Sequence, residues 1–259
     1  ECEIVRANFS TDKSNLMTFD SVGLSFSQGS SDVLLVTFGN YRHVPNISSF
    51  FGLKFAQNNN ISVVGVSAGQ NHWWNTPGFI PAMQRVREFA AGRPIVTYGS
   101  SMGGFAALYA DQWLEPVRII AASPQTAIGP AATWEKRWAS DVQKIDFVQP
   151  DALAQLSDRA EIYLLYDPMH KADAAQADRL LGRSNVVRLP IPWGRHPVLQ
   201  TLREAGCLSS IIRAMVLGEF TPQTFGSVAR MRRKSSTYVA QLAMASAARR
   251  TPNLKLSLA

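Results

Sequence analysis

A serine set among glycines is the group in this sequence best suited to chemistry. Residues 99–103 (GSSMG) have the pattern G-x-S-x-G and lie between an apolar run at 94–98 and an alanine-rich stretch at 105–114. This pattern lets a strand turn sharply into a helix with the central serine exposed, because glycines on either side avoid collisions with neighbouring backbone. The Met102 amide would then open the helix, where unpaired N–H groups and the helix dipole stabilise an oxyanion. The pattern predicts Ser101 as a nucleophile; the alternative is a glycine-rich turn whose serine caps the helix.

The stretch YGSSMGG at 98–104 resembles the nucleophile elbow of bacterial esterases and related acyl-transferring enzymes of the α/β-hydrolase superfamily. The resemblance in strand order extends over residues 20–205. It implies an α/β-hydrolase fold and a serine hydrolase. YGSSMGG and the NHWW sequence at 71–74 are also similar to hydrolase-like proteins associated with bacterial surface-glycan export and modification, among which acyltransferases occur.

A base and an acid must accompany the serine, because a hydroxyl is a poor nucleophile until its proton is removed. The order in the superfamily is Ser, then Asp or Glu, then His. His196, which follows the last predicted strand, is the predicted base, and His170 is expected only to hold a loop or touch substrate. Asp167 directly follows the run EIYLLY and is the predicted acid. Asp173 is the alternative, although it could simply cap the following helix.

The remaining site residues are predicted from two further loops. Gly39 and Asn40 follow the run DVLLVTF at 32–38, so Gly39 would allow a close approach and the Asn40 amide is the second predicted oxyanion donor. The HGGG-type motif of many lipases is absent. Tyr41, which follows Asn40, and three residues of the NHWW loop are predicted to bind substrate; the three are His72, Trp73 and Trp74. The reason is that aromatic faces suit sugar rings or acyl chains. The alternative is a loop packed down by its own aromatic rings.

These residues need a sheet to bring them together, and the sequence predicts one. Short apolar runs predict strands at 22–28, 32–38, 61–67, 94–98, 117–122, 161–166 and 185–192. Helical patterns lie between them at 46–58, 79–91, 105–114, 171–181 and 198–205. Residues 125–158 are less regular, with Trp134 and Trp138 in an amphipathic helical pattern. The alternation predicts an α/β fold with a mainly parallel sheet and helices on both faces, and functional groups at the carboxyl ends of its strands.

Metal and cofactor chemistry have little support in the sequence. The four histidines are scattered, without H-x-x-x-H or H-E-x-x-H spacing, and no cysteine pair has zinc-site spacing. A GxGxxG fingerprint is absent, and Phe105 and Ala106 stand where a P-loop has Lys and Ser or Thr. We therefore expect no metal and no cofactor.

Cysteine usage and the chain's start bear on the compartment. Cys2 and Cys207 lie far apart, which favours two unpaired thiols and fits a reducing environment. No stretch is long and apolar enough to cross a bilayer, and the first residues lack a signal-peptide pattern. They also lack an initiator methionine, which is consistent with a removed leader or preceding domain. We expect a cytoplasmic protein.

The charge of the chain is concentrated in its tail. No acidic residue follows Glu219, and the seven basic residues beyond it equal the whole net charge of +7; they are Arg230, Arg232, Arg233, Lys234, Arg249, Arg250 and Lys255. We expect a catalytic domain at 1–219 and a basic, helical extension at 220–259, with a helix at 238–248. The extension could contact an acidic partner or a membrane surface, or it could be a final helix with a solvated basic face. Nucleic-acid binding is not favoured, because there is no reading motif or aromatic platform.

The sequence thus predicts cleavage of a carboxylic ester through an acyl-enzyme on Ser101. The substrate would be a small-molecule ester or an acylated glycan. One alternative is an O-acyltransferase acting on a glycan or lipid hydroxyl. Another is a catalytically silent hydrolase fold that serves as a binding module.

Overall fold

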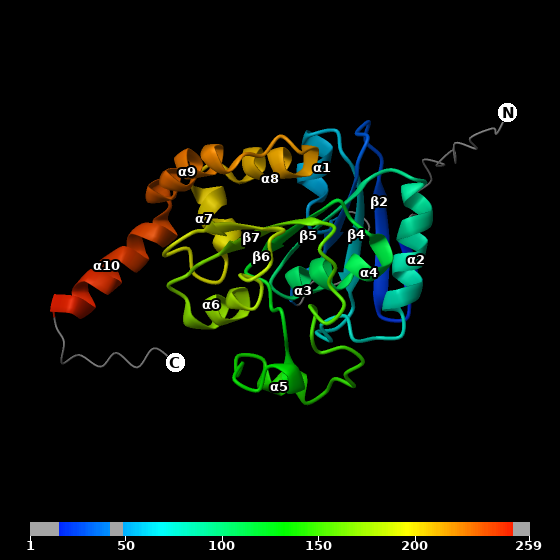
Figure 1. Cartoon of the computed structure of the whole chain (residues 1–259), viewed down its shortest axis with the longest axis horizontal. Helices are drawn as coiled ribbons and strands as arrows, with labels where there is room; N and C mark the ends of the chain where they lie inside the picture. The colour runs from blue at the N-terminus through cyan, green and yellow to red at the C-terminus, as the bar shows by residue number, and fades with distance from the viewer. Residues whose placement is uncertain (1–15, 42–48, 251–259) are drawn as a thin grey trace.

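The computed structural model describes residues 16–41 and 49–250, and an eight-stranded sheet forms the centre of that part of the chain (Figure 1). The strand order is β1-β2-β4-β3-β5-β6-β7-β8. The strands are β1 (Leu16–Phe19), β2 (Val22–Ser27), β3 (Leu34–Phe38), β4 (Ser62–Ala68), β5 (Ile95–Ser100), β6 (Arg118–Ala122), β7 (Glu161–Tyr166) and β8 (Val186–Pro190). β1 and β2 pair antiparallel with their neighbours, and the pairs from β4 to β8 are parallel.

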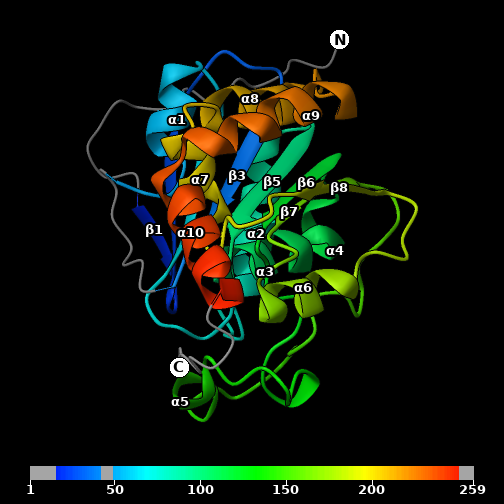
Figure 2. The ribbon, with the colours of Figure 1, turned by 90° about the vertical axis from the view of Figure 1, so that its left-hand side faces the viewer.

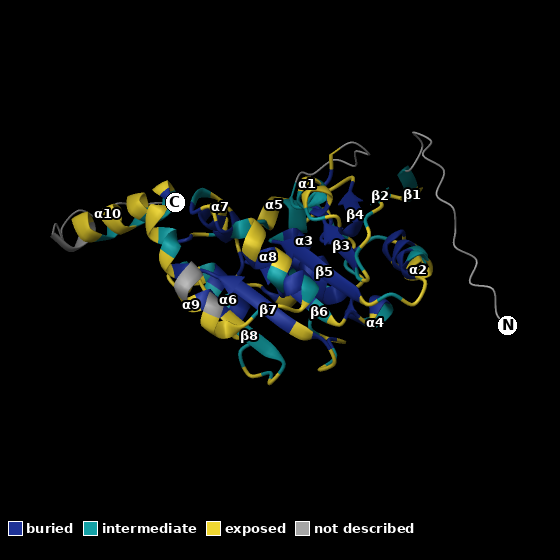
Figure 3. Cartoon of the chain, turned by 90° about the horizontal axis from the view of Figure 1, so that it is seen from above, coloured by how far each residue is buried: buried dark blue, intermediate teal, exposed yellow. Residues whose placement is uncertain are grey.

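Helices cover both faces of the sheet, which explains why its central strands read as continuous apolar runs. One face packs against α2 (Phe79–Ala90), α3 (Met102–Tyr109), α4 (Asp111–Leu114) and α6 (Lys171–Asp178). The other packs against α1 (Leu53–Asn58), α7 (Val198–Glu204) and α8 (Leu208–Leu217). Each face has its own apolar core, and Figure 3 shows the strands buried between the two layers. The predicted α/β architecture is confirmed.

The basic tail continues as α9 (Pro222–Arg230), the 3₁₀ turn η2 (Met231–Lys234) and α10 (Ser236–Arg250). Phe225 of α9 is buried in the core beside α8. α10 lies outside the layers (Figures 1 and 3). It carries exposed apolar side chains, among them Val239 and Leu242. Its start is held by Glu204, whose carboxylate accepts hydrogen bonds from the Ser235 hydroxyl at 2.6 Å and the Thr237 amide at 3.0 Å. The domain boundary at 219/220 and the tail's partner stay predictions.

Two of the helices predicted from sequence differ in the structure. The helix expected at 46–58 begins only at Leu53, after Gly52 in a left-handed conformation, and residues 46–48 lie outside the described part of the chain. The helix expected around Trp134 and Trp138 is wrong. That region contains the 3₁₀ turn η1 (Gly129–Ala131) and the four-residue α5 (Ala139–Val142), with turns between them.

The side chain of Glu135 gives a physical reason for the second difference. Its carboxylate accepts a hydrogen bond from the Arg137 amide at 3.1 Å, a local bond that competes with a helical one. Figures 1 and 2 show that the part of residues 125–158 around α5 projects away from the sheet. None of the helices in the described ranges is both long and apolar enough to span a membrane.

Candidate active site

Ser101 occupies a sharp turn between β5 and α3. Its backbone has φ 56° and ψ −121°, a conformation that costs energy for a residue with a side chain. A Cβ at Gly99 would lie 1.9 Å from the Gly103 carbonyl oxygen, and one at Gly103 would lie 2.4 Å from the Phe38 carbonyl oxygen. Only glycine therefore fits at either side of the serine, so the geometry is the elbow expected from the G-x-S-x-G pattern.

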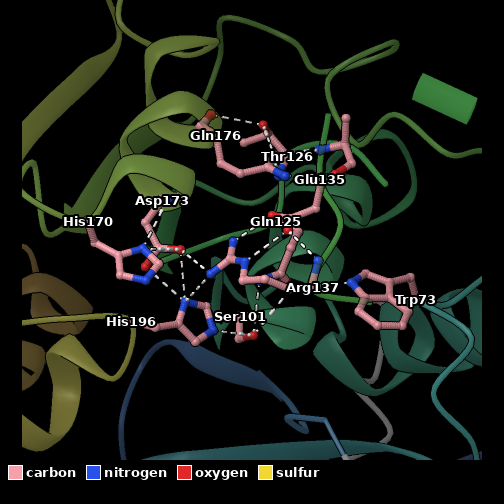
Figure 4. A network of polar contacts seen from close by, with 11 residues as sticks. Trp73, Ser101, Gln125, Thr126, Glu135, Arg137, His170, Asp173, Gln176 and His196 are labelled. Atoms are coloured by element: carbon pink, nitrogen blue, oxygen red, sulfur yellow. Dashed lines mark hydrogen bonds and ion pairs between the residues drawn. The ribbon is translucent and has the colours of Figure 1, made fainter. Parts of the chain in front are cut away.

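The serine hydroxyl lies next to the imidazole of His196, which comes from the loop after the edge strand β8 (Figure 4). His196, in the loop after β8, has its Nε2 atom 2.8 Å from Ser101 Oγ. Its Nδ1 atom lies 2.8 Å from Oδ2 and 2.9 Å from Oδ1 of Asp173, at the start of α6. An ionised carboxylate only accepts hydrogen bonds, so Nδ1 carries the proton and Nε2 is left to accept one from Ser101. The three side chains thus form a continuous chain of hydrogen bonds from hydroxyl to imidazole to carboxylate.

The aspartate that contacts His196 is Asp173, whereas the sequence favoured Asp167 as the acid. Asp167 makes no contact with His196 among the described hydrogen bonds; its Oδ1 accepts the amides of Met169 and Trp193 at 2.8 and 3.0 Å, and its Oδ2 accepts the Arg195 amide at 2.7 Å. Asp173, the alternative, lies within hydrogen-bond distance of His196 Nδ1. The reason is that α6 begins at Lys171, so its first turn points Asp173 at the histidine, whereas Asp167 shapes the loop that carries His196.

Asp173 forms an ion pair with Arg137, which lies in the segment between β6 and β7. Arg137 donates from Nη1 to Asp173 Oδ1 at 2.8 Å, and from Nε and Nη2 to Glu135 at 2.9 and 2.6 Å. Burial alone raises the pKa of Asp173, but hydrogen bonds to His170 and His196 and the charges of His196 and Arg137 outweigh it and hold that pKa below its usual range. Burial also raises the pKa of Glu135, and Arg137 again lowers it overall. Both carboxylates are therefore ionised at neutral pH.

Gln125, in the loop after β6, is a second contact of the nucleophile, and sequence reasoning did not find it. The Nε2 atom of Gln125 lies 3.1 Å from Ser101 Oγ, and its Oε1 atom lies 3.2 Å from Trp73 Nε1. An indole nitrogen only donates hydrogen bonds, so the oxygen of the amide must face Trp73 and its NH₂ must face Ser101. The residue is fully buried. Its position at the carboxyl end of a predicted strand was the one available signal.

Glu135 and Arg137 were likewise missed. Their only sequence signal was an acid–base pair two residues apart in an irregular segment. His170 does not touch the serine; its Nδ1 accepts the Asp173 amide at 3.3 Å and caps α6. This agrees with the expectation that it holds a loop.

The predicted oxyanion donors lie on either side of the elbow. Phe38 of β3 pairs with Gly99 of β5, so Asn40 follows its strand beside the serine, and Met102 is the first residue of α3. The Gly39 amide donates to the Val66 carbonyl at 2.8 Å, so it belongs to the sheet and is not a free donor. The Met102 and Asn40 amides stay the predicted pair.

The NHWW loop packs inward instead of lining an open surface. Trp73 and Trp74 are 0% and 1% exposed, and Trp74 Nε1 donates to the Met102 carbonyl at 3.0 Å, which fastens the loop beneath the elbow. His72 Nδ1 accepts the Trp74 amide at 3.0 Å, and burial lowers the pKa of its ring, partly offset by Asp20. The three side chains are buried, as expected for a loop packed down by its own rings, and their contact with substrate stays a prediction.

Two other aromatic rings lie nearer the surface of the site. Trp138 is half-buried, with its ring centroid 6.3 Å from that of His196 and 4.9 Å from that of Tyr41. The Tyr41 hydroxyl donates to Asp141 of α5 at 2.9 Å. Tyr41 stays a predicted substrate contact, and Trp138 joins it by position.

No group of three or more metal-ligating side chains gathers anywhere in the described residues. Cys207 is a free, buried thiol whose pKa is raised by burial. Cys2 and His43 lie outside the described residues.

Comparisons with known proteins place the fold. No family model and no curated protein sequence matches the chain. Among solved structures, it is similar to the capsule O-acetyltransferase of Neisseria meningitidis serogroup A, with a TM-score of 0.55 and 13% identity over 71% of this chain and 87% of that one. It is also similar to the Glycosylation Associate Protein (Gap123) complex from Streptococcus agalactiae, with a TM-score of 0.61 and 16% identity over 77% of this chain but only 45% of that one.

A third similar structure names the fold. The mouse alpha/beta hydrolase domain-containing protein 10 aligns with a TM-score of 0.50 and 12% identity over 77% of this chain and 95% of that one. Together with the sheet order and the elbow, these likenesses show that the chain has the α/β-hydrolase fold, as predicted.

Proposed function

We propose that this α/β-hydrolase-fold chain is a serine acyl-transferring enzyme that cleaves a carboxylic ester. The observation that carries the proposal is the unbroken contact from Ser101 through His196 to Asp173, with both linking distances at 2.8 Å. These three groups come from three separate elements and meet beside a strained elbow. Strain and buried charge of this kind persist where a site uses them.

In the proposed mechanism each group has its own role. Ser101 Oγ attacks the ester carbonyl while His196 Nε2 takes its proton, and Asp173 stays ionised and stabilises the imidazolium. The carbonyl oxygen becomes negative and is bound by the Met102 amide at the start of α3 and by the Asn40 amide in the loop after β3. His196 then gives its proton to the departing alkoxide, leaving the acyl group on Ser101. Water, deprotonated by His196, attacks that ester; His196 returns the proton to Ser101 Oγ as the acyl–oxygen bond breaks, and the acid is released.

A second outcome shares every step up to the acyl-enzyme. If a sugar or lipid hydroxyl replaces water, the enzyme is an O-acyltransferase, and the likeness to a capsule O-acetyltransferase favours this variant. The donor would then be an acylated small molecule and the acceptor a glycan hydroxyl. Product analysis separates the two: free acid alone supports hydrolysis, and acylated acceptor from an added sugar supports transfer.

Covalent labelling of the serine tests the proposal. The folded chain is treated with a fluorophosphonate probe, and acyl-enzyme formation is followed with p-nitrophenyl esters of different chain length. Ser101→Ala should abolish both signals, whereas Ser100→Ala, a substitution of the neighbouring buried serine, should keep the labelling. Circular dichroism checks that each variant is folded. Absence of labelling in the folded unsubstituted chain would instead favour a silent binding module.

A further inference from the structure

Three ionisable side chains, Asp173, Arg137 and Glu135, form a cluster with the imidazole of His196 (Figure 4). Asp173 and His196 belong to the catalytic arrangement, while Glu135 and Arg137 come from the segment between β6 and β7. The side chains of Glu135 and Asp173 are each 1% exposed, and that of Arg137 is 26% exposed. Arg137 lies between the two carboxylates and donates to both. Its Nη1 atom also lies 3.4 Å from His196 Nδ1.

The position of Arg137 poses an electrostatic problem for the proposed mechanism. A guanidinium beside Nδ1 repels the imidazolium that must form in the transition state, and it also shares Asp173, the group meant to stabilise that imidazolium. The carboxylates that Arg137 contacts are buried and Arg137 itself is partly exposed, so water screens its charge only in part. With Arg137 and Asp173 alone, the surroundings of His196 would be neutral, and protonation would make them positive.

Glu135 changes this balance. Two carboxylates and one guanidinium give a formal charge of −1 while His196 is neutral, and zero once it takes the proton of Ser101. The bidentate contact of Glu135 with Arg137, at 2.9 and 2.6 Å, directs most of the guanidinium towards Glu135. Asp173 then keeps its charge available for the histidine.

We propose that Glu135 is a positioning residue that acts through Arg137: as the counter-ion of the guanidinium, it keeps the cluster negative until His196 is protonated. This inference rests on the proposed function for its catalytic meaning. It assigns a role to the segment between β6 and β7, which the nucleophile, base and acid do not include. Breaking the balance should move the pH range in which His196 works as a base.

The other groups near His196 leave this account unchanged. His170 faces it from the loop before α6, with ring centroids 6.2 Å apart and its Nδ1 atom 3.4 Å from Asp173 Oδ1. It adds a positive charge only when protonated. Ser101 and Trp138 contribute no charge. Asp167 accepts backbone amides, including that of the neighbouring Arg195, and its charge is the same in every variant compared below.

Two isosteric substitutions test the charge balance. Glu135→Gln leaves the cluster neutral, so protonation of His196 becomes harder and the acid limb of the labelling rate should move to lower pH by about one unit. The plateau rate should fall about tenfold, since the imidazolium is less stabilised. The double variant Glu135→Gln/Arg137→Gln restores a charge of −1, so its acid limb should return towards that of the unsubstituted chain. Glu88→Gln, which removes an exposed acid paired with Arg85 on α2, is the matched control and should not move the limb.

A spectroscopic reading separates this inference from the proposed function. NMR of ¹⁵N-labelled histidine follows ring protonation without any turnover, and His196→Gln identifies the resonance among the four histidines. A shifted midpoint for Glu135→Gln in a chain that no probe labels would support the cluster and refute the enzyme. An unmoved midpoint in a chain that is labelled, or a double variant no closer to the original than Glu135→Gln, would overturn the inference.

Discussion

The two halves of the candidate site are built in different ways. The elbow around Ser101 is a continuous piece of chain whose shape follows from its own glycines and from its place between β5 and α3. The acid side joins Asp173 of α6 to Arg137 and Glu135, which lie on another loop and reach it across the carboxyl edge of the sheet. One half is local in sequence, and the other depends on tertiary contacts.

This difference explains what each half contributes. The elbow needs close backbone packing, so its weakness is steric. The acid side consists of charges in a poorly solvated place, so its weakness is the loss of a partner, which leaves another group buried and uncompensated. Substitutions in the two halves should therefore fail differently, in packing at the elbow and in charge and orientation at the acid side.

The largest effect is expected at Asp173. Asp173→Asn removes the carboxylate that fixes the tautomer of His196, and it offers Nδ1 an amide that can present a donor. We expect kcat/KM for ester cleavage to fall by about 10³- to 10⁴-fold while the chain stays folded. Steady-state kinetics with a p-nitrophenyl ester measure the fall. A loss below about tenfold would mean that Asp173 is not the acid.

At the elbow, Gly103→Ala should act on folding. The added methyl would lie 2.4 Å from the Phe38 carbonyl oxygen and 2.9 Å from that of Gly39, so β3 and α3 would have to separate. We expect a loss of roughly 3 kcal/mol in the free energy of unfolding, measured by denaturant titration. Gly182→Ala is the control, because a Cβ there meets no atom within 4 Å. Equal stability of the two variants would contradict the close packing of the elbow.

Substitution of Asp167 should affect both stability and activity, each by a moderate amount. Its carboxylate receives the amides of Trp193 and Arg195, both at positive φ, and so it shapes the loop that carries His196. Asp167→Asn keeps one accepting oxygen but turns an NH₂ towards a backbone donor, at a cost of about 1–3 kcal/mol. We expect a lower melting temperature and a loss of kcat/KM far smaller than for Asp173→Asn. The reverse order of the two activity losses would restore Asp167 as the acid.

The same division explains what could be predicted from the sequence. Seven of the eight strands, the elbow and the pairing of Ser101 with His196 follow from apolar runs and from residues at strand ends, which are local signals. The short edge strand β1 (Leu16–Phe19) was not predicted. The choice between Asp167 and Asp173 does not, because both follow the same strand and only the starting point of α6 decides which one faces the histidine. Gln125, Glu135 and Arg137 meet the site through contacts across loops. The inward packing of Trp73 and Trp74 depends on which partners their N–H groups find, and a pattern of residue types does not specify these.

The smallest predicted effect tests whether Trp73 acts on Ser101 through Gln125. Trp73→Phe keeps an aromatic ring in the core but removes the N–H that holds the Gln125 oxygen, so the amide can turn and lose its donor to Ser101 Oγ. One hydrogen bond of this kind corresponds to a fall of about 2- to 10-fold in the labelling rate of Ser101. Gln125→Met removes the amide itself and sets the upper limit. Because Trp73 is argued to act only by orienting that amide, the double variant should be no slower than Gln125→Met alone. Independent, multiplying losses would show that Trp73 affects the serine by another route, and the elbow would then depend on its own packing alone.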